Sequence, residues 1–260
     1  MTSNGSSCFG FRSDYGSAHT ARTMMLKDLQ LLFEYVKNSD ASKDEYLKAI
    51  AEDNCLKKRS EKTRLLTGRH LAYLYSLDPG ITVFRVLRIF WERDVAGRPL
   101  LALLCSYTRD SLLRLSAPFI LERPEGTNVS RQALENYIEK KEPDRFSAAT
   151  LKSLAQNLNA TWTDSGHLSG KAIKMRIKAV PTAGSVAYGL FLGYLLGYRG
   201  EALFTTEYMR LLDCSFARCV ELAEEASRRG WITFKHIEKV MEIHFPNLLT
   251  SREKEWIHEQ

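Results

Sequence analysis

Apolar residues recur every three or four positions through most of the chain, which is the spacing of one face of an α-helix. In the first half this spacing predicts consecutive helices at about 25–36, 42–53, 60–77, 82–93 and 100–115. Ser60 is the expected N-cap of the third helix, because a serine hydroxyl accepts a hydrogen bond from a backbone N–H of the first turn. The turn formers Asp78-Pro79-Gly80 end that helix.

The second half begins after Arg123-Pro124-Glu125-Gly126, a group of turn formers that we expect to mark a domain boundary. Two helices follow, capped by Ser130 and Ser147, and the second keeps one apolar stripe from Leu151 to Trp162. Later positions predict helices at about 179–198, 206–212 and 216–229. Two short apolar runs, 231–234 and 240–245, predict a hairpin or a pair of edge strands.

These elements predict a mainly α fold with two helical domains that contain helix-turn-helix or winged-helix-like units and short β hairpins. We expect a flexible N-terminal tail over residues 1–16, which are rich in Ser, Gly and Asn. An N-terminal helical domain with a helix-turn-helix-like unit is expected over 17–122. A C-terminal, winged-helix-like helical domain is expected over 123–260.

The segment Ala179 to Tyr198 carries no charge and is about long enough to span a bilayer. It is only moderately hydrophobic, and Ser185, Gly189, Gly193 and Gly197 repeat every four residues. Small residues at that spacing place a smooth seam on one helix face, where another helix can pack closely. We therefore expect a core helix and no stable membrane insertion, although such seams also occur in membrane helices.

Positive charge is concentrated in two blocks. The chain has 37 Lys and Arg against 31 Asp and Glu, a formal net charge of +6, which favours an anionic partner without requiring one. Residues 57–69 hold six basic side chains against Glu61 alone, and residues 145–178 hold six against Asp164 alone. Each block therefore carries about +5, whereas the part after residue 200 is acidic.

Each basic block coincides with a helix, a turn and a second helix, the plan of the helix-turn-helix that places its second helix in the major groove. In the first block, the cations surround the start of the second helix, where long basic side chains meet phosphates. In the second, the helix capped by Ser147 exposes amide side chains, which pair bidentately with adenine. The candidate nucleic-acid-binding residues are Lys57, Lys58, Arg59, Lys62, Arg64, Arg69, Arg145, Lys152, Gln156, Asn159, Lys171, Lys174, Arg176 and Lys178.

The second block also contains a predicted strand with one basic face. Over residues 173–178, apolar side chains alternate with Lys174, Arg176 and Lys178 at period two, the pattern of a half-buried strand. A basic strand after such a helix is what a winged-helix protein uses to hold the neighbouring DNA backbone. Two alternatives remain open: lysines also blunt exposed strand edges, and a Lys-rich helix start also occurs as a plain solvated face.

Known catalytic and metal-binding patterns are missing from the sequence. It lacks the Gly-Lys-Ser/Thr phosphate loop, the Rossmann glycine pattern, His-Glu-x-x-His and Gly-x-Ser-x-Gly. The 6 histidines are scattered, and the 5 cysteines match neither a disulfide framework nor a set of zinc ligands, so we expect reduced thiols. We therefore expect no enzyme activity, no cofactor and no metal, and leave open only a site assembled from distant residues.

Three runs of residues resemble segments of a known protein family: Ser147 to Trp162, Gly166 to Gly170, and Tyr188 to Gly197. The residues from Ser60 to Arg69 are also included in the resemblance. In this order they resemble the BrxA family of bacterial BREX phage-exclusion systems. The resemblance implies a small helical protein that binds double-stranded DNA and works beside larger ATPase, methyltransferase and phosphatase-like proteins. A suggested likeness of the family to NusB-type antitermination proteins implies RNA as an alternative ligand.

The leading hypothesis is a cytoplasmic, non-catalytic accessory protein of a phage-defence system that binds duplex DNA mainly through backbone contacts. Its expected partners are double-stranded DNA, with RNA as the alternative, and other BREX proteins. The competing hypothesis is a protein-interaction scaffold of the defence complex. In that case the acidic C-terminal part or the glycine seam docks a partner, and the basic blocks are only solvated.

Overall fold

The computed structural model describes residues 6–237 and 240–258, and the fold is mainly α, as the helical spacing predicts. The helices of the first half are α1 (Leu26–Tyr35), α2 (Lys43–Ala51), α3 (Glu61–Tyr75), α4 (Thr82–Arg93), α5 (Arg98–Tyr107) and α6 (Ser111–Leu121). Those of the second half are α7 (Arg131–Lys141), α8 (Ala148–Asp164), α9 (Ala183–Leu195), α10 (Glu207–Arg210), α11 (Phe216–Arg228) and α12 (Ser251–His258). The strands are β1 (Asn128–Val129), β2 (Leu168–Ser169), β3 (Lys174–Arg176), β4 (Thr233–Ile237) and β5 (Val240–His244).

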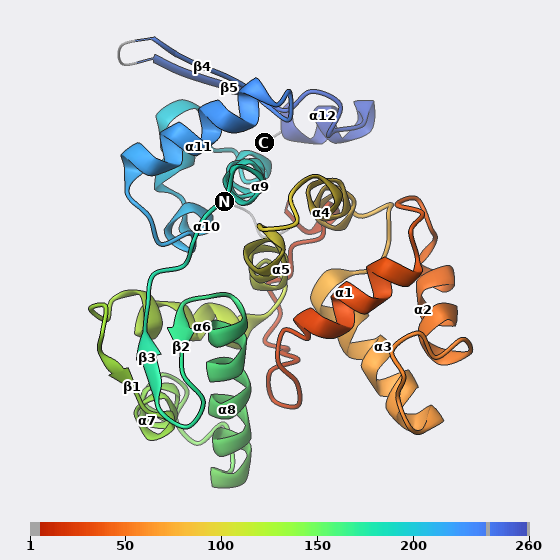
Figure 1. Cartoon of the computed structure of the whole chain (residues 1–260), viewed down its shortest axis with the longest axis vertical. Coiled ribbons are helices and arrows are strands. Elements are labelled where there is room, and N and C mark those ends of the chain that lie inside the picture. The colour runs from red at the N-terminus through yellow and green to blue at the C-terminus, as the bar shows by residue number, and fades with distance from the viewer. Residues whose placement is uncertain (1–5, 238–239, 259–260) are drawn as a thin grey trace.

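Three groups of elements surround α4 and α5. In Figure 1, α1, α2 and α3 lie at the lower right, and α6, α7, α8 and the sheet β1–β3 lie at the lower left. The remaining helices and the hairpin β4–β5 form the top of the view. The two groups that contain the basic blocks therefore lie on either side of the central helices.

The helix expected at 100–115 is instead two helices, α5 and α6, separated at residues 108–110. Asp110 caps α6, because its carboxylate accepts a hydrogen bond from the backbone N–H of Leu113 at 2.9 Å. The same carboxylate accepts the Ser17 hydroxyl at 2.7 Å and the Ala18 N–H at 2.8 Å. The break therefore combines a local cap on α6 with contacts to the N-terminal segment, and only the second of these is distant in sequence.

The glycine-seamed helix α9 belongs to the core. All residues from 183 to 193 are buried, and α9 packs against α4, α5, α10 and α11. A Cβ atom at Gly189 would lie 3.1 Å from Met209, and one at Gly193 would lie 3.0 Å from Thr206. The absence of side chains at these two glycines therefore lets α10 and the turn before it pack closely against α9. Across the described residues, each helix is too short or too polar to cross a bilayer.

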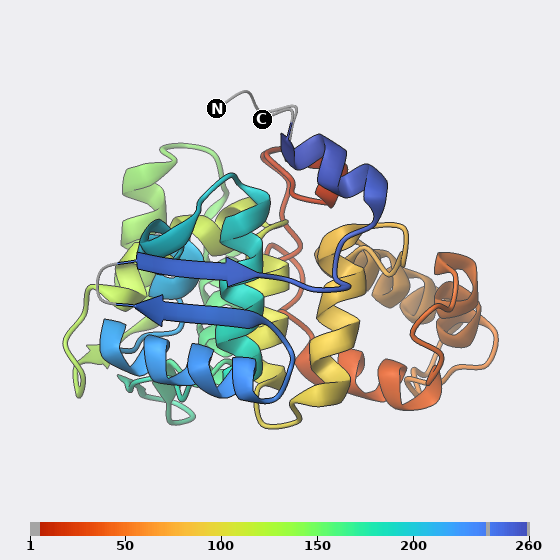
Figure 2. The ribbon, with the colours of Figure 1, turned by 90° about the horizontal axis from the view of Figure 1, so that it is seen from above.

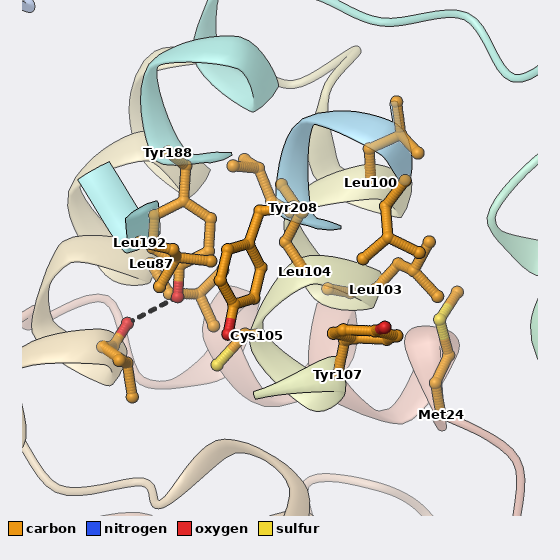
Figure 3. Packing of buried hydrophobic residues seen from close by; sticks show 14 of the residues in the cluster. Met24, Leu87, Leu100, Leu103, Leu104, Cys105, Tyr107, Tyr188, Leu192 and Tyr208 are labelled. Carbon is orange, nitrogen blue, oxygen red and sulfur yellow. Dashed lines mark hydrogen bonds between the residues drawn. The ribbon is translucent and has the colours of Figure 1, made fainter. Parts of the chain in front are cut away.

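Core contacts cross the boundary expected near residues 122 and 123. Tyr188 of α9 lies among Leu87, Cys105 and other buried side chains of α4 and α5 and donates a hydrogen bond to the carbonyl of Val83 at 2.8 Å (Figure 3). Part of the expected N-terminal tail is packed as well, since Phe9 is fully buried. The central helices thus connect both halves of the chain.

The hairpin expected near the C-terminus is present as β4 and β5. The strands are antiparallel, with Thr233 opposite His244 and Ile237 opposite Val240. β4 packs against α11, and Figure 2 shows the two strands as a long ribbon.

Candidate nucleic-acid interface

The group at the lower left of Figure 1 has the element order of a winged-helix domain. α6 is followed by β1, the helix pair α7 and α8, and the strands β2 and β3. β3 is the central strand of an antiparallel sheet of order β1-β3-β2, in which Lys174 pairs with Val129 and Arg176 pairs with Leu168. We call these elements the winged-helix unit, and residues 170–173 between β2 and β3 its wing.

Helix α8 is held at one end and exposed at the other. Leu154, Leu158 and Trp162 are buried, and the Trp162 indole N–H donates to the Ser116 hydroxyl of α6 at 2.9 Å. Ser147 caps the N-terminus by accepting the N–H of Thr150 at 3.2 Å. The exposed side chains of the N-terminal half include Lys152, Ser153 and Gln156. The winged-helix unit thus presents a polar helix face to solvent.

Asn159 does not belong to that face, and its prediction as a base contact is wrong. The residue is 5% exposed, because it lies on the edge of the apolar stripe. Its Oδ1 atom has no hydrogen-bond partner among the described residues. Of the two predicted amide contacts, only Gln156 is therefore exposed.

The wing and the first residue of β3 present two cations and an apolar side chain. Lys171 is exposed, Ile173 is 70% exposed, and the Lys174 ammonium donates to the Gly170 carbonyl at 2.7 Å. Gly170 has φ +92°, and a Cβ atom there would collide with the carbonyl oxygen of Ile173. Only glycine therefore allows the chain to turn this tightly at the wing.

The alternation in β3 is opposite to the expected one. Met175 is 44% exposed, whereas Arg176 is only 2% exposed. The Arg176 guanidinium donates to the Ile120 carbonyl at 2.9 Å and forms an ion pair with Asp213 at 2.7 Å. Its prediction as a phosphate contact is therefore wrong, because buried carbonyls and a carboxylate occupy its donors. Lys178, beyond the strand, is exposed.

Arg145 is also held within the protein. Its guanidinium lies 3.0 Å from the Glu142 carboxylate, donates to the Tyr15 carbonyl at 2.6 Å, and stacks over the Phe146 ring at 4.9 Å. Of the second basic block, Lys152, Lys171 and Lys178 are thus exposed, and Lys174 is partly so.

The first basic block lies in a long connector and in α3. The connector between α2 and α3 runs over residues 52–60, so it is longer than the expected short turn. The Asn54 side chain bonds both the N–H and the carbonyl of Lys58, at 2.8 Å and 3.0 Å, and so fixes its shape. The Lys58 ammonium is paired with Asp28 at 2.7 Å.

Four other cations of this block are exposed. Within the described part of the chain, none of them lies within ion-pair distance of a carboxylate. They are Lys57, Arg59, Lys62 and Arg69. Arg64 is half-buried, and its Nε atom has no hydrogen-bond partner among the described residues.

A pocket of about 450 Å³ lies where the N-terminal helices approach the winged-helix unit. Lys58, Thr63 and Thr67 line it from one side, and Asn157 and Asp164 of α8 line it from the other. Burial raises the pKa of Asp164, which the charges of Lys27 and Lys174 partly oppose. The structure therefore brings residues of both blocks to one cleft, although none of the exposed cations of the two blocks lines it.

A buried polar network in the same region was not predicted. His19 Nδ1 lies 3.0 Å from Asp110, and its Nε2 lies 3.0 Å from the Thr161 hydroxyl of α8. Burial alone raises the pKa of Asp110, but the neighbouring His19 and the bound Leu113 and Ser17 groups lower it to about 2. The network fastens the N-terminal segment to α6 and α8, and it is closed to solvent.

Metal ligation finds no support in the geometry. Among residues 6–237 and 240–258, no three His, Cys, Asp or Glu side chains are grouped so that they could hold an ion. The comparisons with known proteins add no assignment, since no protein-family model and no curated protein matches the chain.

Proposed function

We propose that this protein binds duplex DNA, with the N-terminal half of α8 in the major groove and the wing on the neighbouring backbone. The observation that carries the proposal is the winged-helix element order together with the exposed start of α8. Helix-turn-helix proteins place the first turns of their second helix against base edges. The exposed start of α8 is free to approach DNA in that manner.

The charge around α8 favours a polyanion. Between Asp144 and Asp164 the chain has no acidic residue, so the exposed half of α8 lacks like-charge repulsion toward phosphates. Lys152 on α8 and Lys171 on the wing supply free ammonium groups, while Gln156 supplies an amide for base edges. Lys178 adds a third free cation beyond β3.

The first basic block extends the proposed contact. Its free cations are far more numerous than its paired ones, and they suit non-specific backbone contacts. Together with the resemblance to the BrxA family, this supports a role as a DNA-binding accessory protein in phage defence. The partner proteins of such a role are proposed from the resemblance alone.

The test is a salt-titrated binding assay with a labelled DNA duplex, a single strand and an RNA duplex of equal length. The variant Lys152→Glu/Lys171→Glu/Lys178→Glu should lose about 100-fold in duplex affinity, and its log–log salt slope should fall by about 3. The control Arg228→Glu/Lys235→Glu/Lys254→Glu makes the same charge change in the C-terminal group. It should stay within about threefold of the parent.

Equal binding by the two triple variants would reject the winged-helix unit as the interface. Tighter binding of the RNA duplex would reject duplex DNA as the preferred ligand. Both variants alter exposed side chains, so their thermal melts should match the parent.

A further inference from the structure

Two of the five cysteines are brought into contact. The Sγ atoms of Cys214 and Cys219 are 2.9 Å apart, and the two residues are not joined by a disulfide in the structure. The spacing of the cysteines in the sequence did not predict this pair. It lies outside the proposed DNA-binding surface and does not depend on the proposed function.

The start of α11 explains the contact. Ser215 is the N-cap of this helix and accepts the N–H of Arg218 at 3.2 Å. Cys214 therefore stands just before the cap, and Cys219 stands in the fourth helical position. Side chains at these two positions regularly pack on one another at helix starts. The helix start thus holds the two sulfurs near the bond length of a disulfide, which is about 2.05 Å.

The two thiols differ in access and in acidity. Cys214 is partly exposed and Cys219 is buried. The hydrogen bond from the Cys219 thiol lowers the pKa of Cys214, against the effect of burial. The partly exposed Cys8 and Cys55 show the reverse, since burial raises the pKa of both, that of Cys55 to about 11. Among these three, Cys214 is the thiol suited to react.

We propose that Cys214 and Cys219 are a reversible dithiol–disulfide site that hydroperoxides oxidise. The Cys214 thiolate attacks the peroxide O–O bond, gives a sulfenic acid and releases hydroxide or alkoxide. The Cys219 thiol then attacks the Cys214 sulfur, which forms the disulfide and releases water. Two thiols are oxidised, and one peroxide is reduced.

The position of the pair gives the oxidation a structural consequence. Asp213, next to Cys214, pairs with Arg176 of β3, and the Leu211 carbonyl accepts a hydrogen bond from His167 beside β2. A disulfide ties residue 214 to α11 and thereby restrains the segment that holds the winged-helix unit. Oxidation should therefore raise the melting temperature, because the bond restricts the unfolded chain.

The experiment oxidises the full-length protein with hydrogen peroxide, blocks free thiols with N-ethylmaleimide, and maps the peptides by mass spectrometry. We expect a loss of two hydrogens, one peptide pair joined through Cys214 and Cys219, and reversal by dithiothreitol. In the untreated protein, Cys214 should react with the maleimide about tenfold faster than Cys55.

Single variants separate the two roles. Cys219→Ser should stop at a dimedone-reactive sulfenic acid on Cys214, whereas Cys214→Ser should lose the fast reaction. Cys55→Ser is the matched control and should form the 214–219 disulfide like the parent. Oxidised parent protein with sulfinic acids, intermolecular bridges or no joined peptide would overturn the proposal and leave the pair as a packing contact.

Discussion

Helices α3 and α8 begin in the same way, although they lie in different parts of the molecule. Ser60 caps α3 by accepting the N–H of Thr63, and Ser147 caps α8 by accepting the N–H of Thr150. In both helices the serine and threonine hydroxyls are 2.9 Å apart. The local sequence therefore builds the same helix start twice, each time beside a basic block.

The two blocks differ in how their cations are held. In the first, Lys58 alone is tied to a carboxylate among the described residues, and the other cations are mostly exposed. In the second, Arg145 is tied to Glu142 and Arg176 is buried against Asp213. The two blocks have the same net charge in the sequence, but the first has more cations that are exposed and not ion-paired. Pairing with residues outside a block decides how much of its charge a ligand meets.

The largest predicted effect is a difference in stability between two variants of the second block, one at its buried arginine and one at an exposed lysine. Arg176→Met should lower the free energy of unfolding by about 3 kcal/mol or more, because it leaves the Asp213 carboxylate without its cationic partner and removes a side-chain donor from the Ile120 carbonyl. Lys178→Met should change it by less than about 0.5 kcal/mol. Urea denaturation followed by circular dichroism measures both.

A small stability change in Arg176→Met, together with a large loss of DNA affinity, would contradict the assignment of this arginine to the core. It would restore the interpretation of β3 as a basic face. A stability loss in Lys178→Met of the same size would contradict the distinction between the two residues.

The sequence predicted what is local. The periodic apolar pattern places α2, α3, α4, α7 and α8 within a few residues of their observed bounds, since each helix carries its own apolar stripe and all of them except α4 begin at a serine cap. The hairpin β4–β5 was predicted from two short apolar runs. The break before α6 was missed, although Asp110 is a local N-cap residue, and its contacts with Ser17 and Ala18 lie far away in the sequence.

The candidate site shows the same limit. The exposure of Lys152 and Gln156 follows from the stripe of α8, so it was predictable. The burial of Arg176 depends on Asp213 after α10, which no alternation within residues 173–178 contains. The contact between Cys214 and Cys219 was within reach, because a serine cap between them marks the helix start that joins them.

The second prediction concerns acid stability. His167 is buried next to β2, where its Nε2 bonds the Leu211 carbonyl at 2.9 Å. Burial lowers its pKa from 6.5 to about 4, and the charge of Arg176 adds to this, while Asp213 and the Leu211 carbonyl oppose it. Between pH 4 and pH 6.5, the His167 imidazole is therefore protonated in the unfolded chain but neutral in the native protein. Unfolding free energy should therefore fall by about 3 kcal/mol as the pH drops from 6.5 to 4.

Denaturation at several pH values checks this slope, and His167→Gln should remove most of it while keeping a donor toward Leu211. The counterpart in the N-terminal helices is His70, which is only partly buried and whose pKa burial lowers. His70→Gln should leave most of the slope in place. Asp110 contributes below this window, because its pKa of about 2 keeps its stabilisation until the pH falls under about 3.8. An unchanged slope in His167→Gln would exclude this histidine as the source.

The smallest predicted effect tests the shared helix start. Ser60→Ala and Ser147→Ala each remove a side-chain acceptor from the first turn, and each should lower the free energy of unfolding by about 1 kcal/mol. Ser60→Asp and Ser147→Asp retain a capping oxygen and should recover most of that loss, so they are the matched controls. Equal losses of unfolding free energy in urea denaturation would support the view that each serine cap stabilises its own helix independently. If only Ser147→Ala is destabilising, the packing of α2 against α3 makes the cap of α3 redundant, and the two caps share a geometry without sharing an effect on stability.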